Sequence, residues 1–174
     1  VGLSLTGCAT TSGQGSYISP AQGGLYNSVG TSVSERLTTI KISGDVLDIY
    51  VLPWSGSQSD PRNTFSFKRE SAPQAIAAIE KFMQWYDQAV QRGDQLDKDI
   101  ASMKAGFFDY EVTFSFFSGN KTNHYLLLST CDLIGCHTNA YFDYDNAVEL
   151  KKLFEAFSRG EARSLHSTDT SAYQ

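Results

Sequence analysis

The segment from Phe107 to Phe117 alternates large apolar and small or charged side chains almost without interruption. Phenylalanine, tyrosine and valine occupy the even positions from 108 to 116, and polar residues occupy the odd positions from 109 to 115. Side chains of a strand point alternately to its two faces, so this pattern predicts a strand with one buried and one polar face. We therefore expect the chain to build a sheet that is covered on one side.

Two helical segments supply this cover. Apolar residues recur at helical spacing over 72–92 and stop at Gly93, and a second such stretch over 145–159 stops at Gly160. Glycine is a common terminator of helices because it tolerates the left-handed conformation. We also expect Asp94 to cap a short helix that carries Leu96, Ile100 and Met103.

Three β-rich segments precede each long helix. They cover residues 35–42, 45–53 and 63–69 in the first half, and 107–117, 122–130 and 137–144 in the second. The order predicts two βββα units, produced by duplication or by convergent patterning. Adjacent strands joined by short turns favour an antiparallel sheet, with the helices packed on one face, in the α+β class.

The turn after Ser118 fixes the expected register of the second unit. A two-residue turn at Gly119-Asn120 places Phe114 opposite Tyr125, and pairing of the two nearby cysteines places Leu127 opposite Ala140. In this register several side chains share the polar face of the sheet. They are Ser115, Phe117, His124, Leu126, Leu128, Tyr141 and Asp143.

Charge and hydropathy exclude two classes of function. Lys and Arg number 14 against 19 Asp and Glu, which gives a net charge of −5 with no basic block. A protein that binds the nucleic-acid backbone needs such a block, so no nucleic-acid partner is expected. No apolar run has the length of a membrane-spanning helix.

The N-terminal tetrapeptide Leu5-Thr6-Gly7-Cys8 resembles the lipobox of bacterial lipoproteins, in which an aliphatic residue and two small residues precede an invariant cysteine. The resemblance implies that residues 1–7 are the remainder of a signal peptide and that Cys8 becomes the lipidated N-terminus. It also implies a membrane partner, and Ala9 after the cysteine favours the outer membrane with the domain facing the periplasm.

Composition suggests the domain boundaries. Residues 8–33 are rich in Ser, Gly and Thr with almost no charge, which is typical of a flexible tether. Residues 34–160 are expected to form one α+β domain, and the Ser/Thr-rich residues 161–174 a disordered tail.

Cys131 and Cys136 are the remaining cysteines. In an oxidising compartment such a pair favours a disulfide over free thiols. A zinc half-site is the other alternative, but only His137 lies nearby as a further ligand, so no metal and no cofactor are expected.

Two functional hypotheses follow. In the first, the protein is a non-catalytic, lipid-anchored module that binds an envelope protein or a glycan. Its binding face would combine apolar side chains on the polar side of the sheet with an exposed loop tryptophan: Phe117, Leu126, Leu128, Tyr141 and Trp54. In the alternative, the row of Ser115, His124 and Asp143 serves a small envelope hydrolase, although Ser115 lacks the glycine-rich surroundings of a typical nucleophile.

Overall fold

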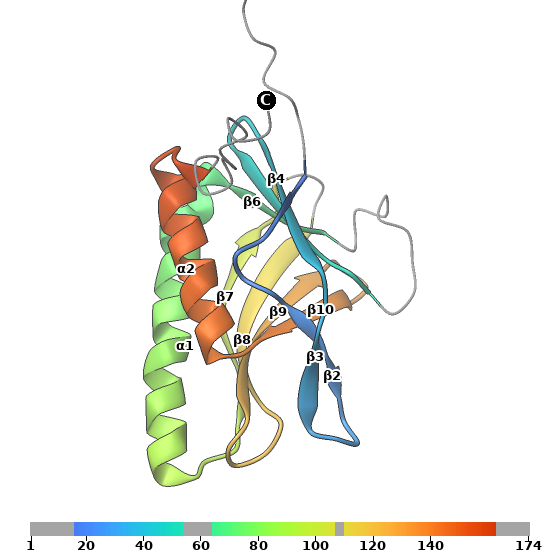
Figure 1. The fold of residues 1–174 in the computed structure, drawn as a ribbon, viewed down its shortest axis with the longest axis vertical. Helices are drawn as coiled ribbons and strands as arrows, with labels where there is room; N and C mark the ends of the chain where they lie inside the picture. The colour runs from blue at the N-terminus through green and yellow to red at the C-terminus, as the bar shows by residue number, and fades with distance from the viewer. Residues whose placement is uncertain (1–15, 54–63, 107–109, 163–174) are drawn as a thin grey trace, which may run out of the picture.

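The computed structural model describes residues 16–53, 64–106 and 110–162. They form two antiparallel sheets and two long helices, which confirms the predicted α+β class (Figure 1). Neither helix in this part of the chain has the length and apolarity that a membrane crossing requires.

The strands divide between a four-stranded and a six-stranded sheet, where the sequence predicted a single one. The smaller sheet has the order β1 (Tyr17–Ile18), β4 (Thr38–Ser43), β5 (Val46–Val51) and β6 (Thr64–Lys68). The larger has the order β3 (Ser32–Glu35), β2 (Gly24–Asn27), β10 (Cys136–Phe142), β9 (His124–Cys131), β8 (Glu111–Ser118) and β7 (Asp97–Lys104).

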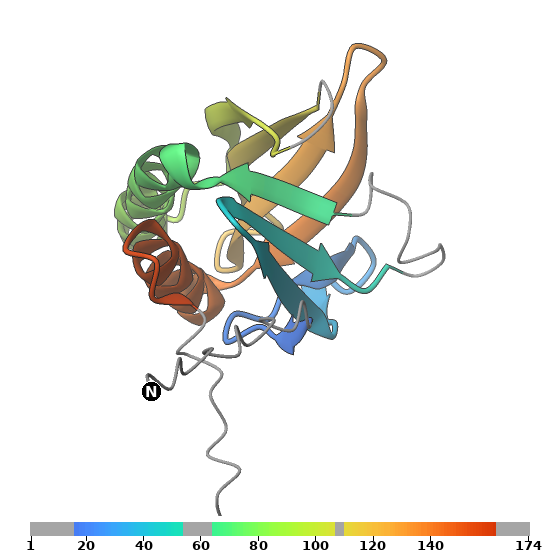
Figure 2. The same cartoon turned by 90° about the horizontal axis from the view of Figure 1, so that it is seen from above.

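Both helices lie side by side along one side of the sheets (Figures 1 and 2). A single 3₁₀ turn, η2 (Arg69–Ser71), leads into α1 (Ala72–Arg92). Helix α1 ends where predicted, at Gly93, whose φ of 67° is left-handed. Helix α2 (Tyr144–Ser158) starts at Asp143, whose carboxylate accepts a hydrogen bond from the Asn146 backbone amide at 2.9 Å.

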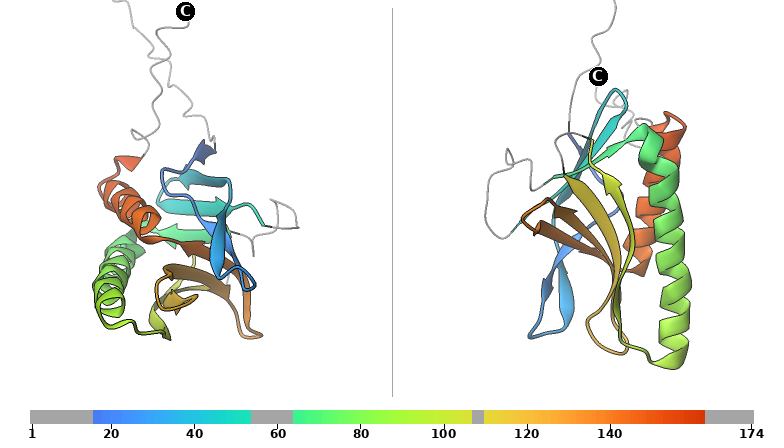
Figure 3. Two further views of the ribbon diagram at one scale, coloured as in Figure 1. Left: turned by 60° about the horizontal axis from the view of Figure 1, so that its bottom comes forward. Right: turned by 180° about the vertical axis from the view of Figure 1, so that it is seen from behind.

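The core joins the two sheets to α2 through three phenylalanines. The ring of Phe67 in β6 lies 5.8 Å from that of Phe114 in β8 and 4.9 Å from that of Phe154 in α2. All three side chains are fully buried. The view from behind shows the two helices running alongside the curved sheets (Figure 3).

The predicted order of two βββα units is present as β4-β5-β6-α1 and β8-β9-β10-α2, with β7 as an additional strand between them. Corresponding positions face the core in the two units. Phe67 lies opposite Leu47 in the first unit, and Phe142 lies opposite Leu126 in the second. All four side chains are fully buried.

The short helix predicted after Asp94 is wrong, since this segment forms β7 and pairs with β8. A bulge between Asp99 and Ala101 interrupts the alternation of the strand. In the sequence Ile100 and Met103 are three positions apart, which is the spacing of a helix turn. The bulge allows a strand to carry this spacing.

The tether predicted over residues 8–33 is replaced by structure from residue 16 onward, where β1, β2 and β3 form. Glycine here permits close packing rather than flexibility. A Cβ on Gly24 would lie 2.3 Å from the Val33 side chain and 2.5 Å from the Ser34 carbonyl oxygen. The expected signal peptide, Cys8, Trp54 and residues 163–174 of the expected tail lie outside the described residues.

The predicted register of the second unit is also wrong, because five residues, 119–123, separate the paired positions Ser118 and His124. The side-chain oxygen of Asn120 accepts hydrogen bonds from the backbone amides of Thr122 and Asn123, which stabilises this longer turn. The difference from the predicted pairing is an odd number of residues, so every side chain of β9 changes face.

Leu128 consequently lies opposite Phe114, on the buried face. A second irregularity, between Cys136 and Thr138, shifts the pairing of β10 with β9 by one residue. Ala140 therefore lies opposite Leu128 and not opposite Leu127, as the sequence predicted. Leu126 and Leu128 are both fully buried.

Cys131 and Cys136 are joined by a disulfide, as predicted, at the turn between β9 and β10. The Asp132 carboxylate accepts hydrogen bonds from the backbone amides of Ile134 and Gly135, at 2.7 and 3.1 Å. Leu133, at the tip of the turn, is completely exposed.

Candidate functional site

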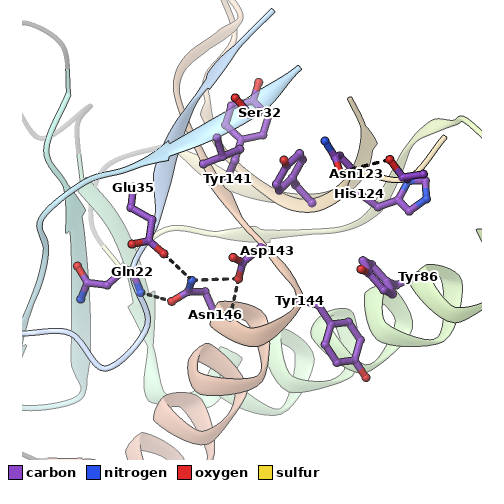
Figure 4. A pocket seen from close by; sticks show the side chains of 13 residues that line it. Gln22, Ser32, Glu35, Tyr86, Asn123, His124, Tyr141, Asp143, Tyr144 and Asn146 are labelled. Carbon is purple, nitrogen blue, oxygen red and sulfur yellow. Dashed lines mark hydrogen bonds between the residues drawn. The ribbon is translucent and has the colours of Figure 1, made fainter. Parts of the chain in front are cut away.

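A cleft of about 340 Å³ opens between the β2–β3 hairpin, the adjoining ends of β9 and β10, and the two helices (Figure 4). Sites for small molecules typically have volumes of roughly 300–1,000 Å³. Five separate stretches of the chain contribute to the lining, and Val33 is the only aliphatic side chain among the described lining residues.

Aromatic rings form two walls of the cleft. On one wall Tyr125 and Tyr141 lie against Tyr26, whose ring centroid is 6.3 and 5.5 Å from theirs. On the other wall Tyr86 from α1 and Tyr144 from α2 are 4.7 Å apart. Tyr86, Tyr125, Tyr141 and Tyr144 all line the cleft, and each combines an apolar ring with a polar hydroxyl group.

The side-chain amide of Asn146 joins two carboxylates in the cleft (Figure 4). Its nitrogen donates to Asp143 Oδ1 at 3.0 Å and to Glu35 Oε1 at 3.4 Å, and its oxygen accepts from the Gln22 backbone amide at 2.7 Å. This network holds both carboxylates in place. The second oxygen of each, Oδ2 and Oε2, has no hydrogen bond within the described part of the chain.

The cleft carries negative charge. Among the described residues no lysine or arginine lines it, and neither Asp143 nor Glu35 forms a salt bridge with any of them. Burial raises the pKa of the Tyr125 phenol, and the negative charge of Asp143 contributes to this rise. The negative charge of Asp143 therefore acts on the aromatic wall that contains Tyr125.

His124 closes one end of the cleft and is 2% exposed. Its Nδ1 lies 2.9 Å from the Ser118 hydroxyl, and its ring packs against Phe116 and Tyr86. Nε2 has no hydrogen-bond partner among the described residues. Burial lowers the pKa of His124, against a smaller opposing effect of the Lys121 backbone, so the ring is uncharged at neutral pH.

The row of Ser115, His124 and Asp143 predicted from the sequence is not formed. Ser115 points to the outer face of the sheet, where its hydroxyl donates to Asp99 at 2.7 Å, whereas His124 lies on the inner face. Asp143 caps α2 and shares only the cleft with His124. The odd register shift of β9 separates the serine from the histidine.

The predicted binding face is likewise not formed as proposed. Leu126 and Leu128 belong to the core, and Phe117 is covered by Tyr26, whose ring centroid is 4.7 Å away. The β2–β3 hairpin, which carries Tyr26, therefore covers this part of the face. Of the predicted face, Tyr141 lines the cleft.

No group of three metal-ligating side chains that could hold an ion occurs in the three described ranges. No protein-family model, curated protein or solved structure matches the chain. The fold and the cleft define an α+β domain with a preformed, negatively charged aromatic site, and its function has to be inferred from that geometry.

Proposed function

We propose that the protein is a lipid-anchored, non-catalytic module of the cell envelope that binds a small polar group in the cleft. The cleft is the observation that carries this proposal. Its aromatic walls and hydrogen-bonded carboxylates are held in place by the protein before any ligand arrives, which reduces the entropic cost of binding.

The chemistry of the cleft favours binding over turnover. Asp143 is occupied as the cap of α2, and Ser115, the nucleophile suggested by the sequence, lies on the other face of the sheet. The Ser118 hydroxyl, which does contact His124, accepts a hydrogen bond from the Leu96 amide and does not line the cleft. Covalent catalysis requires a nucleophile and a base within hydrogen-bond reach of each other, and this pair does not meet that condition.

The anchor is proposed from the sequence. Leu5-Thr6-Gly7-Cys8 has the pattern of a lipobox, so Cys8 would carry a diacylglyceryl group and hold the domain at the periplasmic face of the outer membrane. Two acyl chains are sufficient for stable membrane attachment.

Cys8→Ser is expected to abolish membrane attachment, since a hydroxyl does not replace the thiolate that accepts the lipid. A precursor containing this sequence should fractionate with membranes in a lipoprotein-processing bacterium, and the Cys8→Ser form should remain unprocessed or soluble. The double variant Cys131→Ser/Cys136→Ser is the matched control and should stay membrane-bound. Equal membrane association of the Cys8→Ser form would contradict the anchor.

Equilibrium dialysis of the purified full chain against solubilised envelope fragments tests the site. Mass spectrometry should find a fragment that is enriched on the protein side with its mass unchanged after hours of incubation. Asn146→Ala should reduce this enrichment at least tenfold, because it releases Asp143 and Glu35 from their fixed positions.

Asn139→Ala, which removes the same side chain from β10 outside the cleft, should leave the enrichment unchanged, and thermal melts should show that both variants are folded. Conversion of the fragment into products by the wild-type chain would contradict a non-catalytic role and would favour the hydrolase alternative.

A further inference from the structure

We infer that the cleft recognises an organic ammonium group, presented by a protonated amine on a peptide or sugar or by a quaternary ammonium head group. This inference rests on the proposed binding function and adds the chemical class of the ligand. It is carried by the juxtaposition of two aromatic walls with two carboxylates that form no salt bridge with a described residue.

The charge of the lining is the first argument. Asp143 and Glu35 accept hydrogen bonds from the same Asn146 nitrogen, so two negative charges lie on either side of one amide. In the described part of the chain no cationic side chain of the lining compensates them, and His124 is uncharged at neutral pH. A cation is attracted by both carboxylates at once, whereas an anionic ligand is repelled by both.

The aromatic walls are the second argument. A cation over the face of a tyrosine ring is attracted by the ring quadrupole, and aromatic cages bind ammonium groups in this way. Tyr86 and Tyr144 form one such wall and Tyr125 and Tyr141 the other.

The third argument is the buried acceptor at one end of the cleft. Nδ1 of His124 lies 2.9 Å from the Ser118 hydroxyl, and Nε2 is buried without a hydrogen-bond partner among the described residues. When Nδ1 donates its proton to the Ser118 hydroxyl, Nε2 carries the lone pair and can accept a hydrogen bond. An unsatisfied acceptor favours a ligand that brings N–H donors.

The same geometry argues against a metal ion. A divalent cation needs several oxygen ligands converging on one point. Here the atom between the two carboxylates is an amide nitrogen that already donates to both, so their oxygens do not converge on one empty point. An ammonium group is larger, tolerates looser coordination and gains from the rings as well.

The test uses matched pairs of probes that differ in charge, titrated into the full chain carrying Cys8→Ser at low ionic strength and neutral pH. The pairs are choline with 3,3-dimethylbutan-1-ol, glucosamine with glucose, and Nα-acetyl-lysinamide with its Nε-acetylated form. In at least one pair the charged member should bind ten or more times more tightly, and added salt should weaken it. The pair with the largest ratio identifies the source of the ammonium group.

Asp143→Asn and Glu35→Gln keep the oxygens that Asn146 contacts and remove the charge, and asparagine retains the helix cap. Each substitution should weaken the charged probe at least fivefold and leave the neutral probe unchanged. Asp145→Asn is the control, because it removes the same charge from the first turn of α2 outside the cleft. It should change the affinity less than twofold.

Two results would overturn the inference. If the neutral member of every pair bound as tightly as the charged one, the cleft would still be a binding site, but for an uncharged group such as a glycan. If no charged probe bound, the ligand class would be wrong, whereas the dialysis experiment would decide separately whether the cleft binds anything.

Discussion

Leu128→Asp is expected to prevent the protein from folding. Leu128 is fully buried in β9, where it lies opposite Phe114 on one side and Ala140 on the other. The substitution removes about 1.5–3 kcal/mol of apolar burial and places an unpaired carboxylate in the core, which costs several kcal/mol more. A total loss of about 5 kcal/mol or more equals the whole stability of many domains of this size.

Circular dichroism and thermal melting should therefore show an unfolded or aggregated Leu128→Asp chain. Leu133→Asp introduces the same change at a completely exposed position in the neighbouring turn and should melt within a few degrees of wild type. A folded Leu128→Asp variant would mean that β9 has the opposite face inward, as the two-residue turn would require.

Phe154→Ala is expected to cost about 3–5 kcal/mol, the usual range for a large-to-small substitution of a buried phenylalanine. The effect should lie at the upper end of this range, because the ring contacts Phe67 of one sheet and Phe114 of the other. The loss thus opens a cavity where both sheets meet α2, and three separate elements would have to move to close it.

Urea denaturation gives the free energy of unfolding of each form. Phe154→Leu, which keeps most of the apolar volume, should lose less than half as much stability as Phe154→Ala. A loss below about 1 kcal/mol for the alanine variant would show that α2 does not pack against both sheets as described.

Features that depend on local sequence were predictable from it. The end of α1 at Gly93 depends on one residue that adopts a left-handed conformation. The strand at β8 depends on alternation within eight residues, and the disulfide depends on two cysteines five positions apart. Each of these signals is complete within one short stretch of chain.

Features that depend on counting residues between strands were not predictable. The turn after Ser118 is longer than a two-residue hairpin because of the Asn120 side chain, and this difference moved His124 and Leu128 to the other face. The cleft was missed for a related reason. Tyr144, Asn146 and Glu35 each look ordinary in sequence, and only tertiary packing of separate elements brings them together.

The outer strand β7 bears on how the protein behaves at high concentration. A strand at the edge of a sheet presents unpaired backbone groups that can pair with a second molecule and start a polymer. Half of the residues of β7 are charged, namely Asp97, Lys98, Asp99 and Lys104, and its bulge breaks the regular hydrogen-bonding row. The irregularity that makes this strand resemble a helix in the sequence thus protects the folded molecule against edge-to-edge aggregation.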